Sequence, residues 1–149
     1  MLYRFLLFVH LASVVTWVGG MAFALLCLRP AAAALEASQR IALMQRALGK
    51  FFPLVNMAIV FILASGIMMI VMSGIRNPPA AWYVMIAAGA LMMGIFWHLR
   101  AVPFKSFCRL ADMQDWAAAG VQLNQVRMMV AVNLGLGFLV IAVMKIAVA

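Results

Sequence analysis

The side chains of this sequence that could bind a metal are two histidines, His10 and His98, and fourteen methionines. Imidazole and thioether are both copper ligands, thioether particularly for Cu(I), and imidazole also ligates haem iron. Both histidines fall within long apolar segments. Ionisable residues in such segments usually face the interior of a helix bundle or a cavity. Their positions therefore predict a metal or haem centre inside a membrane protein.

Four apolar segments would have to position these side chains. Each has the length of about 20 residues that a helix needs to cross a bilayer. The chain is 69% hydrophobic and 9% charged, whereas an ordinary soluble domain is roughly 25% charged. The segments lack the alternation of membrane barrel strands. We therefore predict an all-α integral membrane four-helix bundle, a single domain over residues 1–149, with spans at about 5–28, 51–75, 80–99 and 128–149.

Positive charge is concentrated in the first and third connections between these spans. The basic residues there are Arg29, Arg40, Arg46, Lys50, Arg100, Lys105, Arg109 and Arg127. Cytoplasmic loops collect Lys and Arg, so we predict cytoplasmic long connections and two periplasmic termini in a bacterial inner membrane. The alanine-rich stretch after Pro30, and Asp115 as the N-cap of the following WAAAG, predict that these connections are partly helical.

The two histidines are predicted near opposite faces of the membrane. At about 1.5 Å per residue, His10 lies roughly 8 Å below the outer boundary and about 20 Å in depth from His98. Within one subunit they cannot bind the same iron or copper ion. Near His10 the same count predicts an outer layer of Met68, Met69, Met72, Met85, Met144 and Lys145. Near His98 it places Asn56 and Asn133, which are expected to hydrogen-bond between helices.

A stripe of mostly small or polar residues follows one face of the first span. His10, Ser13, Trp17, Gly20 and Ala24 recur every three or four residues, which is the period of a helix face. Small residues let a neighbouring backbone or a flat ligand come close. The spacing leaves open whether the stripe lines a porphyrin edge or packs against another helix. Likewise, the methionines could be ligands or core packing.

Several stretches of the chain resemble stand-alone bacterial CopD-type membrane proteins. They are HLASVVTWVGGMAF, followed by Arg29 and Pro30, then GKFFPLVNMAIVFILASGIMMI, FWHLRAVPFKSFCRL and DWAAAGVQLNQVRMMVAVNLGLGFLVIAV. That family is associated with copper resistance or uptake. The chain is also similar to HemJ-type protoporphyrinogen oxidases, four-helix proteins that bind haem b.

The HemJ-type resemblance implies particular residue roles. His10 matches the haem-ligating histidine of that group, and His98 matches a histidine near the end of its third helix. Arg127 and Lys145 fall where the group has a functional arginine and a late lysine. The group has an acidic residue and a proline after the arginine, whereas RMMVAVN follows here, and KIAVA stands where it has proline and phenylalanine after the lysine. The resemblance therefore implies the fold and haem binding more directly than the oxidase activity.

The leading hypothesis is an inner-membrane b-type haem protein with a role in electron transfer or tetrapyrrole redox chemistry. In it His10 is an axial ligand, Met85 or Met144 is a candidate second ligand, and Trp17 and Gly20 line the macrocycle. Lys145 or Arg76 would pair with the haem propionates on the outer side, as cations do with carboxylates. Arg127 is a further cofactor-binding candidate, which the HemJ-type resemblance implies. An oxidoreductase of the protoporphyrinogen oxidase type is the corresponding enzyme class.

The alternative hypothesis is a copper-binding or copper-transport protein that uses His10 and the outer methionines as ligands. His98 would then serve in a separate metal site, or together with His10 only through a subunit interface. A third hypothesis is an assembly subunit without a cofactor. The expected partners are membrane lipid, a second copy of the chain, and a quinone or other redox partner. Nucleic acid is not expected, because no basic stripe is combined with stacking aromatic residues.

Overall fold

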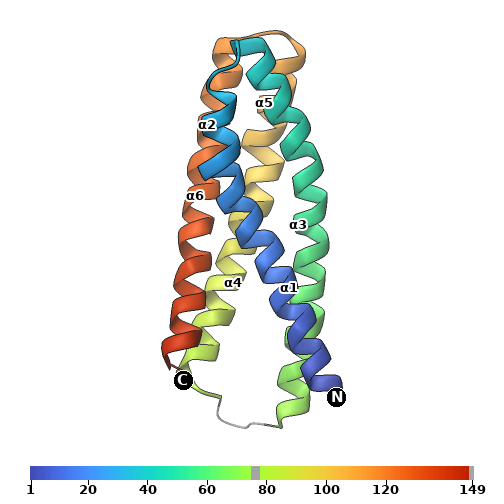
Figure 1. Ribbon diagram of the computed structural model, residues 1–149. Helices are drawn as coiled ribbons and strands as arrows, with labels where there is room; N and C mark the ends of the chain where they lie inside the picture. The colour runs from blue at the N-terminus through green and yellow to red at the C-terminus, as the bar shows by residue number, and fades with distance from the viewer. Residues whose placement is uncertain (75–77, 148–149) are drawn as a thin grey trace.

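The computed structural model describes residues 1–74 and 78–147, and these residues contain helices and no strands. Four long helices lie side by side (Figure 1). The first comprises α1 (Leu2–Phe23), the π-helical turn η1 (Ala24–Leu28) and α2 (Arg29–Ala32), and the second is α3 (Ala37–Ser73). The third comprises α4 (Ala80–Leu99), the π-helical turn η2 (Arg100–Phe104) and α5 (Lys105–Asp112), and the fourth is α6 (Trp116–Ala147). The predicted all-α four-helix architecture is confirmed.

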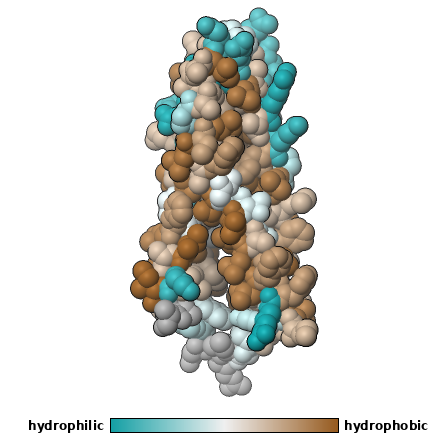
Figure 2. Space-filling model, viewed as in Figure 1, coloured by the Kyte–Doolittle hydropathy of each residue, from teal (hydrophilic) through white to brown (hydrophobic). Residues whose placement is uncertain are grey.

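The surface of the bundle is apolar around its middle. Figure 2 shows hydrophobic residues covering most of the visible face, with hydrophilic residues gathered mainly at one end. Large apolar side chains point outward, and Phe8, Val15 and Val60 are 67%, 69% and 62% exposed. All four helices are long and apolar enough to cross a membrane. An exposed apolar belt of this extent suits contact with lipid, so the chain is a multi-pass membrane protein.

The two ends of the bundle differ in what they carry. Both chain termini lie at one end, called here the terminal end (Figure 1). The opposite end, called here the basic end, carries the first and third connections, which are largely helical as predicted. The backbone N–H of Ala118 donates to Oδ1 of Asp115 at 3.1 Å, which confirms Asp115 as the N-cap of α6.

Two prolines lie within helices near the basic end. A proline in a helix lacks an N–H donor, and its ring clashes with the carbonyl four residues earlier. Pro30 lies in α2, two residues after the wider π-helical turn η1 ends, and Pro103 lies inside η2. Such a turn gives the backbone room to accommodate the proline. Both helices therefore continue past their prolines to the basic end.

The four helices pack as two pairs, α1 with α3 and α4 with α6. An aromatic cluster joins the pairs midway along the bundle. The ring of Phe96 on α4 lies 6.1 Å from Trp17 on α1 and 5.6 Å from Phe52 on α3. Val18 of α1 also packs against Gly137 of α6. These contacts hold the pairs together in the middle of the molecule.

The pairs diverge toward the terminal end (Figure 1). Ala81 is the only side chain that is buried among residues 2–12, 66–73, 80–91 and 138–146. The core therefore occupies the middle and the basic end of the bundle, and the terminal end is loosely packed.

Asn133 of α6 links the second helix pair. It is 2% exposed, and its Nδ2 donates to the carbonyl of Met92 on α4 at 3.0 Å. This confirms its predicted role between helices. Asn133→Ala is expected to lower the free energy of unfolding by about 1 kcal/mol, in the range measured for hydrogen bonds between membrane helices. Unfolding in mixed detergent micelles checks this, with exposed Asn124→Ala as the control. Equal losses in both variants would contradict the assignment.

Candidate functional site

His10 is held against α3 by its Nδ1 atom. Nδ1 lies 3.1 Å from the carbonyl oxygen of Ile62 and 3.2 Å from Oγ of Ser65. A carbonyl can only accept, so the Ile62 contact places the proton on Nδ1. The Ser65 hydroxyl itself donates to the carbonyl of Phe61. The imidazole is therefore in the tautomer that leaves the lone pair of Nε2 available.

The free Nε2 atom makes His10 a good candidate ligand. In the described part of the chain no residue hydrogen-bonds to Nε2, and the side chain is only partly buried. Histidines that bind metals usually donate their other ring N–H to a carbonyl or carboxylate, which fixes the tautomer and the ring orientation. Gly66 allows this position, because a Cβ there would lie 3.3 Å from Cε1 of His10.

Three methionines of the predicted outer layer lie on α3 after Ser65 and differ in how exposed their side chains are. Met69 follows Ser65 by four residues on α3, so it lies on the same helix face as the residues that His10 touches, and it is partly buried. Met68 and Met72, three and seven residues after Ser65, share this side of α3 but are more exposed, at 48% and 44%. Met69 is therefore the least exposed of these three thioethers.

Met85 and Met144 belong to the second helix pair. Met85 lies four residues after buried Ala81 on α4, and Met144 lies seven residues after Gly137, whose Cβ position faces Val18. Both are therefore on the inward stripes of their helices, and both are partly buried. Together with Met69, they give three inward thioethers at the loosely packed terminal end.

Trp17 and Gly20, predicted to line a cofactor, are used for helix packing. Trp17 is 3% exposed and packs edge-on against Phe96. A Cβ at Gly20 would overlap the ring of Phe51 on α3. Ser13 of the same stripe donates to the carbonyl of Val9 at 2.8 Å. The stripe therefore follows the packing alternative from residue 13 onward, and His10 is its one member with a free nitrogen lone pair.

His98 lies far from His10 and points outward. It is exposed, whereas its neighbour Phe96 packs on Trp17. Trp17 is seven residues along α1 from His10, about 10 Å nearer the basic end. Lys145 is also exposed, and Arg76 lies outside the described residues. His98 is therefore not brought together with His10, and Lys145 makes no hydrogen bond to His10 within the described residues.

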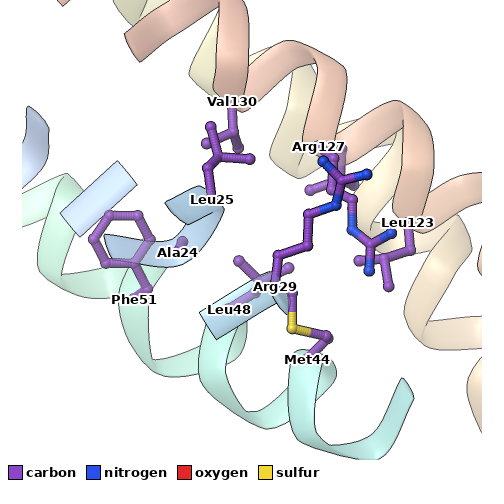
Figure 3. Close-up of a pocket in the computed structure, with 10 residues that line it drawn as sticks. Ala24, Leu25, Arg29, Met44, Leu48, Phe51, Leu123, Arg127 and Val130 are labelled. Atoms are coloured by element: carbon purple, nitrogen blue, oxygen red, sulfur yellow. The ribbon is translucent and has the colours of Figure 1, made fainter. Parts of the chain in front are cut away.

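Arg127 lies at the basic end, where Arg29 and Arg40 join it. The three arginines line a cavity of about 270 Å³. A smaller pocket of about 20 Å³ beneath it includes Met44 of α3 (Figure 3). Met44 is eighteen residues from Ile62 on α3, roughly 27 Å along the helix. Arg127 therefore cannot act on a ligand of His10. The residues that were predicted to bind one cofactor lie in two separate regions, with His10 toward the terminal end and Arg127 at the basic end.

His10 has no partners of the usual metal-binding types among the described residues. Residues 1–74 and 78–147 contain no cluster of three or more His, Cys, Asp or Glu side chains that could hold a metal. The donors that the terminal end offers are one imidazole and several thioethers. This donor set is soft and carries no formal charge, which suits Cu(I) far better than Zn²⁺ or Mg²⁺.

Comparison with known proteins bears on the same question. No curated protein and no solved structure matched the chain. A family model described as copper resistance protein D matches residues 45–148. The matched segment contains Met69, Met85, Met144 and Arg127, and it begins after His10. This chain belongs to the copper resistance protein D (CopD) family.

Proposed function

We propose that this protein handles copper within the membrane and that Nε2 of His10 is a copper ligand. The observation that carries the proposal is the fixed tautomer of His10, with Nδ1 directed at the Ile62 carbonyl and Nε2 left free. Membership of the CopD family supports copper as the metal. Copper here is either a resident ion or the ion that the protein carries.

The thioethers of Met69, Met85 and Met144 are the proposed partners of His10 in the site. Thioether and neutral imidazole are ligands that favour Cu(I). Both are uncharged, so a monovalent ion would be bound without moving a carboxylate into the membrane interior. The contact of Nδ1 with Ile62 would orient the ring and raise the basicity of Nε2.

The haem hypothesis receives less support than the copper alternative. Haem b is the first choice of the sequence argument, and it rests on the resemblance to the HemJ type. The family that matches is described by copper resistance. Trp17 and Gly20, which the haem hypothesis needs beside the macrocycle, are occupied by Phe96 and Phe51. Copper therefore replaces haem as the proposed ligand.

The location of the protein is proposed to be a bacterial inner membrane. The basic residues of the first and third connections gather at the basic end. Under the positive-inside rule that end faces the cytoplasm. The terminal end, with His10 and the three inward methionines, would then face the periplasm.

The test is the metal content and the visible spectrum of the purified protein. After incubation with Cu(I) and removal of free metal, we expect one tightly held copper ion per chain and no Soret band. Zinc treated in the same way should be washed out, because thioethers do not hold it. A preparation with a Soret band and no copper retention would overturn the proposal in favour of haem.

A further inference from the structure

Three arginines from separate parts of the chain converge on one cavity at the basic end. Arg29 belongs to α2, Arg40 lies near the start of α3, and Arg127 lies on α6. All three line the cavity of about 270 Å³, together with Trp116 at the start of α6. In Figure 3, Arg29 and Arg127 reach toward each other from opposite helices. This convergence of positive charge is not explained by the proposed copper site.

Among the residues that the structure describes, these arginines lack an acidic partner. The chain has three acidic residues, Glu36, Asp112 and Asp115. Oδ1 of Asp112 accepts a hydrogen bond from Gln45, and Asp115 caps α6. Glu36 is exposed at the start of α3. No ion pair to any of the three arginines is found within the two described ranges, so their mutual repulsion is not offset by protein carboxylates.

Arg127 carries the strongest sign of a missing partner. Its Nε is buried and makes no hydrogen bond with any described residue. The charges of Arg29 and Arg40 both act on its guanidinium. A buried polar group without a hydrogen bond is costly, and a buried charge without a counter-ion more so. An anion in the cavity would give this Nε a hydrogen-bond partner and would offset the repulsion among the three partly exposed guanidinium groups.

We propose that this cavity binds a phosphate group. Guanidinium groups match phosphate oxygens in charge and geometry, because two parallel N–H donors can meet two oxygens. The cavity is far larger than the roughly 10–15 Å³ that one water needs. Trp116 on its wall is of the residue type enriched at headgroup depth. The phosphate could therefore belong to an anionic phospholipid headgroup or to free inorganic phosphate.

The experiment measures how probes stabilise the full-length protein after delipidation in an uncharged detergent. One arm titrates inorganic phosphate against sodium chloride at equal ionic strength. The other titrates phosphatidylglycerol against diacylglycerol, which lacks a phosphate. A ligand that binds only the folded state raises the unfolding temperature with its concentration. Stabilisation by inorganic phosphate identifies the free anion, and stabilisation by phosphatidylglycerol alone identifies the lipid headgroup.

Arginine variants show whether the cavity is responsible. Arg40→Gln and Arg127→Gln are expected to weaken the apparent affinity for the stabilising probe about tenfold each, the effect of one lost charge-assisted contact. The matched control is Arg46→Gln, which removes the same charge from an exposed site on α3 outside the cavity. It should change the affinity less than about twofold.

Two further readouts separate this site from a structural role and from the copper site. Without any probe, Arg40→Gln and Arg127→Gln should unfold at or above the temperature of the wild type, because each relieves repulsion. Both variants should retain copper binding, because Ile41 on the cavity wall is twenty-one residues from Ile62 on α3, roughly 32 Å along the helix. The proposal is overturned if neither probe stabilises the protein, or if Arg46→Gln weakens binding as much as Arg127→Gln does.

Discussion

His10→Ala is expected to lower the affinity of the protein for Cu(I) at least about 100-fold. Loss of an outer-shell partner of a metal ligand typically costs 10–100-fold in affinity, and loss of a ligand itself should cost no less. The proposed ligand is Nε2, which is free because Nδ1 is bonded to the Ile62 carbonyl. Competition with a chromophoric Cu(I) chelator measures the affinity.

The control for this prediction is His98→Ala. It removes the same side chain from an exposed position away from His10, so the affinity should stay within about threefold of the wild type if that residue is outside the site. Helical content of both variants should match that of the wild type, and His10→Ala should lower the unfolding temperature slightly because it removes the hydrogen bond to Ile62. If His98→Ala weakens Cu(I) binding and His10→Ala does not, the ligand assignment is wrong.

Gly20→Val is expected to lower the free energy of unfolding by about 1–3 kcal/mol, the usual cost of overpacking. A Cβ at Gly20 would overlap the ring of Phe51 on α3, so the α1–α3 pair must open or the ring must leave its place. Unfolding in mixed detergent micelles measures the change. The effect is large because two helices approach each other at this residue.

Gly19 provides an adjacent control for Gly20. A Cβ at Gly19 would meet nothing within 4 Å, so Gly19→Val should change the unfolding free energy by less than about 0.5 kcal/mol, as surface substitutions usually do. The two variants carry the same new side chain at neighbouring positions of one helix. Equal destabilisation in both would show that helix propensity, and not the contact with Phe51, decides the result.

The fold could be predicted because membrane-spanning helices are recognisable from their apolar composition. Long apolar segments give the number of helices, and an even number places both termini at one end. The alanine-rich connection and the Asp115 cap are local signals, so helical extensions at the basic end followed from them. The π-helical turns at Pro30 and Pro103 were not predicted, because the adjustment around a helical proline depends on packing at both ends.

The site was only partly predictable from sequence. The separation of His10 from His98 could be predicted, because the depth of a residue in a membrane helix depends only on the helical rise per residue. Hydropathy does not specify which helices pack against each other. That pairing determines the contacts of the other candidate residues. Gly20 faces Phe51, so it packs a helix and lines no ligand. Arg127 joins Arg29 and Arg40 because α2, α3 and α6 meet at one end, and the sequence shows these arginines only as charges in separate connections.

X-ray absorption at the copper edge of the Cu(I)-loaded wild-type protein reports the atoms bound to the metal. The proposed site predicts sulfur scatterers together with one imidazole, and it predicts that the imidazole signal disappears in His10→Ala. Methionine is the expected source of the sulfur, and Met69→Leu should reduce its contribution. A first shell of nitrogen and oxygen alone, unchanged in His10→Ala, would contradict a copper site at this histidine.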